Sequence, residues 1–214
     1  SGQKVAIVGP TGAGKTTLIK LLMRFYDVDG GSILVDGVDT KEMTRHELRD
    51  RFGMVLQDAW LFEGSIRDNI AYAQDNLPEE KIIAAARSAS VDSFIKTLPG
   101  GYDFELSTGA ENISQGQRQL LTIARAMASD PEIMILDEAT SNVDTHTEQL
   151  IQKALAKLMH GRTSFVIAHR LSTIRDADMI LYMEHGDILE HGSHEELMAQ
   201  HGKYEALYMS QFAQ

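Results

Sequence analysis

The sequence predicts an α/β fold in which a mostly parallel sheet is flanked by helices. Short apolar runs rich in β-branched residues, such as residues 4–8 and 163–167, have the length and composition of buried strands. Stretches with apolar residues at helical spacing, such as residues 16–25, alternate with these runs. Strands that alternate with helices give a parallel sheet with helices on its faces. A largely helical stretch, residues 78–129, interrupts this order and is predicted to form an inserted helical subdomain.

The first half of the chain contains short elements bounded by turn residues. Two strands and a short polar helix are predicted there, at residues 32–35, 53–56 and 45–51. Residues 78–97 have the pattern of two helices with one polar side, and Pro99 and the two glycines after it end that pattern. The following residues, 103–112, are predicted to form a loop.

The second half returns to longer and more regular elements. Ser114 is predicted to cap a helix that runs to about Ser129, because it directly precedes apolar residues at helical spacing. The apolar residues 133–136 are predicted to form a buried strand, and residues 144–158 form a helix with one apolar face. Residues 179–190 read as two strands joined by a turn, and two helices close the chain.

Residues 9–17 form the motif around which the chain is organised. They match the phosphate-binding pattern G-x-x-x-x-G-K-[ST] in Gly9, Pro10, Thr11, Gly12, Ala13, Gly14, Lys15, Thr16 and Thr17. The glycines lie where a strand turns into a helix, so backbone N–H groups and the helix N-terminus can face an anion. Lys15 adds a full charge at the β- and γ-phosphates, and the Thr16 hydroxyl is placed to bind Mg²⁺. The flanking strand and helix favour phosphate binding over a chance glycine-rich turn.

The composition excludes several classes of protein. A length of 214 residues fits one α/β domain, and a formal net charge of −11 disfavours nucleic acid as a main partner, because phosphate backbones select basic faces. The absence of cysteine excludes disulfides. No apolar run approaches the length that crosses a bilayer, so we expect no direct insertion into a membrane.

Polar residues that follow predicted strands complete the phosphate site. Asp137 directly follows an apolar strand, and its carboxylate is predicted to hold Mg²⁺, through water, opposite Thr16. Glu138 points in another direction and is predicted to be the general base for the attacking water. Gln57 ends the strand at residues 53–56, and ligands bind at the carboxyl ends of such strands. We therefore predict that Gln57 faces the nucleotide, both as a catalytic residue and as a metal ligand.

A second anion site is predicted at the start of the helix that Ser114 caps, because a helix N-terminus attracts negative charge. Residues 113–117 read Ile-Ser-Gln-Gly-Gln. The order of the P-loop, Gln57, this element, the two adjacent carboxylates and His169 resembles the nucleotide-binding domain of ATP-binding cassette (ABC) proteins over essentially the whole chain. The family signature is usually Leu-Ser-Gly-Gly-Gln, and here its first and third residues differ. The resemblance implies that the unchanged residues, Ser114, Gly116 and Gln117, contact phosphate.

The resemblance implies an ATPase with ATP and Mg²⁺ as cofactors and a second nucleotide-binding domain as partner. In the family two such domains pack head to tail, and each signature closes over the ATP held by the other P-loop. Asp144 matches the D-loop and is expected at that interface. His169 matches the switch histidine that contacts the γ-phosphate and orients the attacking water with Glu138. Residues 1–214 would then form one domain, with a P-loop core at 1–77 and 130–214 around the helical insertion.

Residues 57–70 carry a narrower resemblance, to the segment after the Q-loop in ABC exporters of the multidrug and lipid type. In those exporters this region docks onto short helices of the transmembrane domain. The resemblance therefore implies a transmembrane domain as partner, export as the activity and the cytoplasmic face of the membrane as the location. Trp60, Leu61 and Phe62 lie in a predicted loop here, and either burial within the domain or a docking surface would account for them.

Two other functions stay open from the sequence. One is a nucleotide-dependent clamp with little turnover, such as the degenerate half of a heterodimer, although the intact Glu138 and His169 count against it. The other is a soluble ABC ATPase of repair or translation, which the exporter-like stretch disfavours. ABC domains usually stack adenine on an aromatic residue upstream of the P-loop. The chain starts too late to include that residue, so we expect a truncated N-terminal antiparallel lobe.

Overall fold

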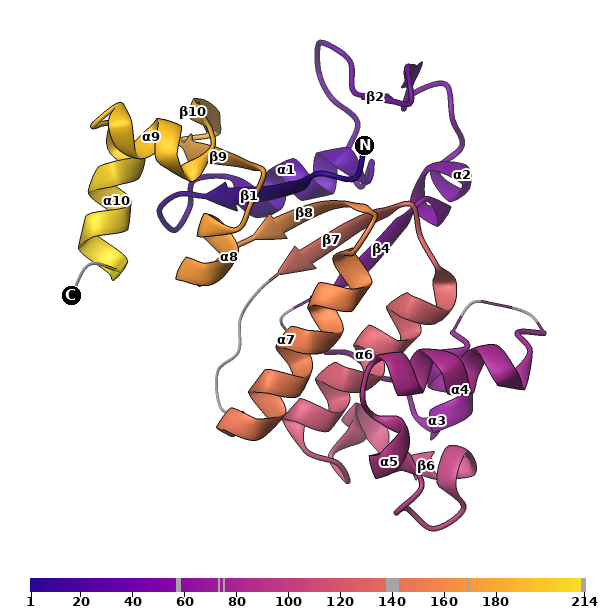
Figure 1. The fold of residues 1–214 in the computed structure, drawn as a ribbon. Coiled ribbons are helices and arrows are strands. Elements are labelled where there is room, and N and C mark those ends of the chain that lie inside the picture. Colours follow the sequence, from indigo (N-terminus) through magenta and orange to yellow (C-terminus); the bar gives the residue numbers. More distant parts are fainter. Residues whose placement is uncertain (57–58, 73, 75, 138–142, 169, 213–214) are drawn as a thin grey trace. The chain divides into compact units, whose positions relative to one another are not determined.

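The computed structural model describes residues 1–56, 59–72, 74, 76–137, 143–168 and 170–212. The chain forms two compact units, which are described separately (Figure 1). The first unit comprises Ser1–Phe52, Glu132–Glu138 and Gly161–Gln214. The second comprises Gly53–Pro131 and Ala139–His160. These bounds are wider than the predicted insertion at residues 78–129, because neighbouring helices on both sides of it pack into the second unit.

The first unit is built on a mostly parallel sheet, as predicted. Its strands are β1 (Lys4–Val8), β7 (Ile133–Asp137), β8 (Thr163–Ile167), β9 (Met179–Glu184) and β10 (Asp187–Gly192). β1 pairs in parallel with β8 and β9, and β8 pairs in parallel with β7. β10 pairs with β9 antiparallel, and the sheet order is β10-β9-β1-β8-β7-β4. The chain passes from the first unit to the second at β4 (Phe52–Val55).

Burial explains why these runs become strands. Four consecutive residues of β1, Val5 to Val8, are all buried, because the strand has a partner on each edge and is covered on both faces. Continuous apolar sequence is the usual composition of such a central parallel strand. The apolar run therefore predicted a buried strand, and the sheet order adds that this strand lies in the interior of the sheet.

Shorter elements complete the first unit. They are α1 (Lys15–Leu22), β2 (Leu34–Val35), β3 (Val38–Asp39), α2 (Arg45–Asp50), α8 (Leu171–Arg175), α9 (His194–Ala199) and α10 (Lys203–Phe212). α1 ends before the predicted residue 25, because Arg24 has a positive φ of 52°. The Arg24 guanidinium donates to the carbonyl oxygens of Thr40 and Met43, which holds the chain in this turn.

The second unit is a helical assembly around one long helix. Its elements are β5 (Gly64–Ser65), α3 (Ile66–Ile70), α4 (Glu79–Ser88), α5 (Asp92–Ile95), β6 (Glu105–Leu106), α6 (Gln115–Ser129) and α7 (Thr145–Met159), with short 3-10 turns at Gly101–Asp103 and Thr108–Ala110. α3, α4 and α7 all pack on α6. The sequence did not predict β3, β5, β6, α3 or α8, because elements of two to five residues carry too little periodicity to stand out.

Candidate nucleotide-binding site

β1 and α1 hold the P-loop between them. α1 begins at Lys15, and Gly14 precedes it as the N-cap residue in the left-handed conformation, with φ 101°. The first N–H groups of a helix have no partner within the helix, so this end of α1 presents hydrogen-bond donors to an anion. Thr16 and Thr17 are exposed at the same end, whereas Ala13 is buried in the loop. The strand, loop and helix that the motif requires are therefore all present.

The Lys15 side chain lies back over the loop. Its Nζ donates to the carbonyl oxygens of Gly9 at 2.8 Å and Pro10 at 2.9 Å. Burial lowers the pKa of the Lys15 ammonium, and the negative charge of Asp137 acts in the opposite direction. The carboxylate of Asp137 thus lies near enough to the P-loop to act on its lysine.

The register of the sheet explains why Asp137 comes close to the P-loop. Asp137 at the end of β7 lies beside Ile167 of β8, and Ile7 of β1 lies on the other side of the same residue. The carboxyl ends of β1 and β7 therefore reach the same edge of the sheet, where ligands bind in parallel α/β folds.

The donor groups at this edge fit Mg²⁺. A carboxylate from Asp137 and a hydroxyl from Thr16 are hard oxygen ligands, which Mg²⁺ prefers. Within the described ranges no group of three or more His, Cys, Asp or Glu side chains is arranged to hold a metal ion. Mg²⁺ usually takes only one or two protein carboxylates and completes its shell with substrate phosphates and water. The two residues therefore fit a magnesium ion bound together with a nucleotide.

Three of the predicted catalytic and metal-binding residues, Gln57, Glu138 and His169, lie outside the described residues. The structure thus brings the P-loop and Asp137 together in the first unit and gives no position for these three.

The signature residues form the start of α6 in the second unit. Ser114 is the N-cap residue, as predicted, and its Oγ accepts from the Gln117 N–H at 3.3 Å. The Gln117 Oε1 in turn accepts from the Ser114 N–H at 2.9 Å, which completes a capping box. Ser114 and Gln115 are exposed, so this end of α6 is open to an anion. The S-x-x-Q spacing is the sequence signal for the capping box, and sequence reasoning had used only the N-cap.

The start of α6 packs against the start of α7 at Gly116, and Asp144 caps α7 at the same place. A Cβ on Gly116 would collide with Thr147 and come within 3.2 Å of Val143 Cγ1, so the two helices meet closely only with glycine here. Asp144 is the N-cap residue of α7, and its Oδ1 accepts from the Thr147 N–H at 3.0 Å. This backbone hydrogen bond lowers the pKa of Asp144. The predicted D-loop aspartate is therefore exposed beside the signature residues of the same chain.

An aromatic cluster with two exposed rings, Trp60 and Tyr72, lies after Gln57 in the sequence. Trp60, Phe62 and Tyr72 have ring centroids 5.8–6.2 Å apart, while the adjacent Leu61 is buried. Trp60 is 59% exposed, so burial accounts for only part of the apolar segment. Arg125 of α6 lies 4.8 Å from the Tyr72 ring and donates to the Trp60 carbonyl oxygen at 3.0 Å. No sequence pattern predicted that Tyr72 and Arg125 contact this segment.

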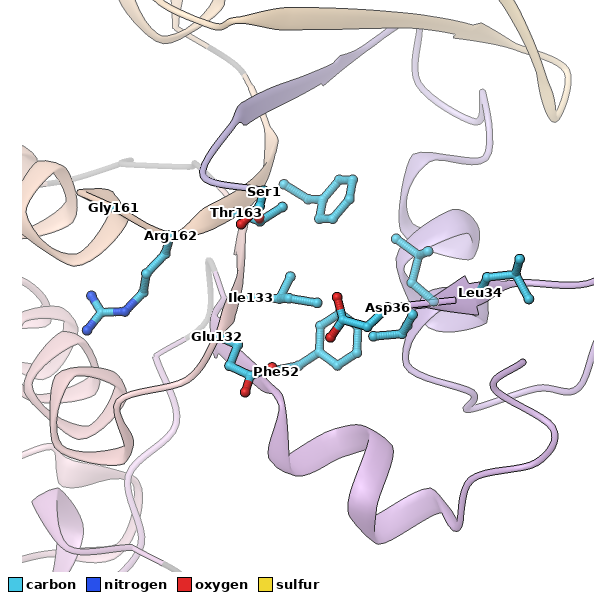
Figure 2. A pocket seen from close by; sticks show the side chains of 12 residues that line it. Ser1, Leu34, Asp36, Phe52, Glu132, Ile133, Gly161, Arg162 and Thr163 are labelled. Carbon is cyan, nitrogen blue, oxygen red and sulfur yellow. The ribbon is translucent and has the colours of Figure 1, made fainter. Parts of the chain in front are cut away.

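A cavity of about 600 Å³ in the first unit is separate from the P-loop residues. Its lining includes Leu34 of β2, Phe52 and Ile133 of β7, and Figure 2 shows Phe52, Ile133 and Asp36 among the side chains that line it. Arg51 forms ion pairs with two lining carboxylates, Asp36 at 2.8 Å and Glu132 at 3.5 Å. The acidic groups of this cavity thus neutralise a neighbouring arginine.

The described helices include none that combines the length and the apolar character needed to span a bilayer.

Comparisons with known proteins agree with the P-loop site and the α/β fold described above. The family model described as ABC transporter matches residues 1–141. A fatty acid ABC transporter ATP-binding/permease protein of Mycobacterium bovis is 57% identical over 203 residues, which are 95% of this chain and 32% of that protein. An ATP-dependent lipid A-core flippase of Desulfotalea psychrophila is 50% identical over 211 residues, which are 99% of this chain and 37% of the flippase.

A solved structure of a bacterial Atm1-family ABC exporter with ATP bound is also similar. It superimposes with a TM-score of 0.91 at 43% identity, over 100% of this chain and 37% of that chain. The chain therefore spans about a third of the length of the relatives it matches. The family match over more than half of the chain, on the P-loop α/β fold described above, shows that the chain belongs to the ABC transporter family.

Proposed function

We propose that this chain is the ATP-binding and ATP-hydrolysing part of an ABC exporter. The observation that carries the proposal is the P-loop between β1 and α1, with Lys15 and Asp137 at the same edge of the sheet. Catalysis of phosphoryl transfer depends mainly on positioning and on the stabilisation of charge. Backbone N–H groups, the lysine ammonium and a metal-binding carboxylate supply both at this edge.

In this proposal the P-loop residues 9–17 hold the phosphates of ATP, and Lys15 moves from the carbonyl oxygens of Gly9 and Pro10 to the β- and γ-phosphates. Thr16, Asp137 and Gln57 hold Mg²⁺, which when bound neutralises charge on the phosphate oxygens. Glu138 takes a proton from the attacking water, and His169 and Gln57 orient that water. The assignments to Gln57, Glu138 and His169 rest on their places in the sequence.

The second part of the proposal is a head-to-tail dimer. Ser114, Gly116 and Gln117 at the exposed start of α6 provide an anion site that contacts the ATP held by a second domain, and Asp144 lies at that interface. The exposure of Ser114 and Asp144 supports this assignment.

The third part is a transmembrane partner. The relatives are about three times as long as this chain, and one of them is named as an ATP-binding/permease protein. We assign the aromatic cluster of the exposed Trp60 and Tyr72 and the half-buried Phe62 to the surface that docks on the transmembrane domain, at the cytoplasmic face of the membrane. ATP binding closes the dimer and hydrolysis opens it, which moves the docked membrane helices and drives export.

The test is the replacement Glu138→Gln in the purified chain. We expect loss of ATP turnover, retained ATP binding and an ATP-bound dimer that light scattering detects. Glu42→Gln is the control, because it removes a carboxylate from an exposed position of the first unit. Unchanged turnover in the Glu138→Gln variant would refute the assignment of the base.

The dependence of turnover on protein concentration tests the dimer. A rate per chain that rises with concentration supports self-pairing. Rates that stay near zero at all concentrations would instead indicate a nucleotide-dependent clamp or the need for a different partner domain.

A further inference from the structure

The P-loop begins in close contact with a strand that has no assigned part in nucleotide binding. β1 and β9 are parallel neighbours, and Val8 lies beside Tyr182 in their register (Figure 1). One residue further along each strand, Gly9 lies so close to Met183 that a Cβ on Gly9 would collide with the Met183 carbonyl oxygen. The first glycine of the P-loop is therefore fixed against the end of β9.

The turn that joins β9 to β10 then contacts the P-loop directly. The Gly186 N–H donates to the carbonyl oxygen of Ala13 at 2.9 Å. A Cβ placed on Gly14 would come within 3.3 Å of the Gly186 Cα, so the turn packs along this peptide of the loop. Ala13 itself is only 3% exposed.

This hydrogen bond fixes the direction of another N–H group. In a planar trans peptide the C=O and the N–H point in opposite directions. The bond from Gly186 holds the Ala13 carbonyl towards the turn, so the N–H of Gly14 in the same peptide points away from it. A carbonyl that accepts a hydrogen bond also polarises its peptide, which makes the N–H a better donor.

Residues at the start of α10 hold this hairpin in place. Glu184 of β9 forms an ion pair with the Lys203 ammonium. The Glu190 carboxylate of β10 accepts from the Lys203 N–H at 2.6 Å and from the Tyr204 N–H at 2.9 Å. Tyr204 is buried, with 1% of its surface exposed. One helix thus ties down both strands of the hairpin, and the turn between them is held against the loop.

We propose that the β9–β10 turn is a positioning element of the nucleotide site. The Gly186 N–H orients the Ala13–Gly14 peptide so that the Gly14 N–H donates to the polyphosphate of ATP. This role rests on the proposed function, and it adds to the site a residue that lies 173 positions after Ala13 in the sequence. Gly186 touches no nucleotide in this assignment and acts through the loop.

The test is a pair of matched substitutions, Gly186→Ala and Gly37→Ala. Both glycines have a positive φ, 89° and 81°, and a Cβ at either meets no atom within 4 Å. Each alanine keeps its backbone N–H but strains its turn to a similar degree, and of the two turns that of Gly186 holds a donor to the P-loop, which the strain displaces. We expect the Kd for MgATP to rise about tenfold in Gly186→Ala, as for one weakened hydrogen bond to a charged group, and to change less than about twofold in Gly37→Ala.

Two further readouts separate positioning from a general loss of structure. The midpoint of urea unfolding is expected to shift to a similar extent in both variants. Inorganic tripolyphosphate is used as a competitor of MgATP. Its affinity for Gly186→Ala is expected to fall by the same factor as the affinity for ATP, because the affected contact is to phosphate. Gly186→Asn and Gly37→Asn serve as a rescue pair, since asparagine tolerates positive φ and keeps the N–H in place, and the Kd of Gly186→Asn for MgATP is expected to stay close to that of the unaltered chain.

The outcomes distinguish this inference from the proposed function. An unaltered chain that binds no MgATP would overturn the proposed function and this inference with it. Normal binding by the unaltered chain with equal Kd values in Gly186→Ala and Gly37→Ala would overturn the inference alone. A loss of ATP affinity without loss of tripolyphosphate affinity would also overturn it.

Discussion

Ser114 has a structural role in the second unit and a separate proposed role towards ATP, and two substitutions separate them. Its hydroxyl caps α6 by accepting from the Gln117 N–H. Alanine removes this bond, and the loss of an N-cap side chain costs about 1 kcal/mol of the free energy of unfolding. Aspartate caps a helix as well as serine does and interacts favourably with the helix N-terminus. The free energy of unfolding of Ser114→Asp should therefore lie within about 0.5 kcal/mol of that of the unaltered chain.

The two substitutions differ in their effect on the proposed dimer. A carboxylate at residue 114 would face the phosphate of the partner's ATP. Two like charges roughly 4 Å apart repel by about 4 kcal/mol at an effective dielectric constant of 20. Because the head-to-tail dimer of two identical chains contains this contact twice, the repulsion would weaken the ATP-bound dimer by at least about a thousandfold. Ser114→Asp is thus expected to be stable but unable to dimerise.

The assay is light scattering of the ATP-bound dimer in a Glu138→Gln background, with urea unfolding measured on the same samples. Ser193 provides the control, because it begins α9 with the same capping box as Ser114. Ser193→Ala should lose a similar free energy of unfolding, and Ser193→Asp should dimerise normally. A Ser114→Asp variant that dimerises like the unaltered chain would refute the placement of residue 114 at phosphate.

Two other predictions follow from side-chain contacts. Arg125→Lys should lower the free energy of unfolding by about 2 kcal/mol, since lysine cannot replace the three hydrogen bonds of the guanidinium to Trp60 and Asn69. Arg118→Lys serves as its control, because it removes a single exposed contact. Fluorescence of Trp60, the only tryptophan in the sequence, reports the local change. Equal free energies of unfolding in the two variants would contradict the prediction. For His194, burial and then the positive charge of Arg175 lower its pKa, so the unfolded chain takes up the proton first and stability should fall as the pH drops below about 6.5. His194→Asn keeps an acceptor for the Tyr204 hydroxyl but does not titrate, so urea unfolding at pH 7.5 and 5.5 should show a smaller decline, and an unchanged decline would count against this role.

The contact with the α10 tyrosine acts in the same direction as burial and favours the neutral form of His194. The His194 Nδ1 lies 2.8 Å from the Tyr204 hydroxyl. Burial raises the pKa of Tyr204 to about 12, so the phenol keeps its proton and is able to donate a hydrogen bond to Nδ1 in the tautomer that leaves this nitrogen unprotonated. A protonated imidazole would instead bring a second donor to this contact.

Patterns among neighbouring residues predict much of the secondary structure. The central strand β1 and the helix bounds of α6 follow from a continuous apolar run and from a serine cap with helical periodicity. The buried face of α7, formed by Ile151, Ala154, Leu155 and Leu158, was likewise readable from its spacing. These features are encoded in neighbouring residues, because strand and helix periods repeat within a few positions.

The sequence by itself also placed the P-loop at a strand–helix junction and Asp137 at the end of a strand. Only the tertiary structure decided that β9 lies beside β1, that the Gly186 N–H reaches the Ala13 carbonyl and that Arg125 lies under Trp60 and Tyr72. These contacts join residues far apart in the chain, and no local period records them. Strand order and hydrogen bonds between distant backbone groups depend on how whole elements pack, so they exist only once the sheet and the helices have assembled.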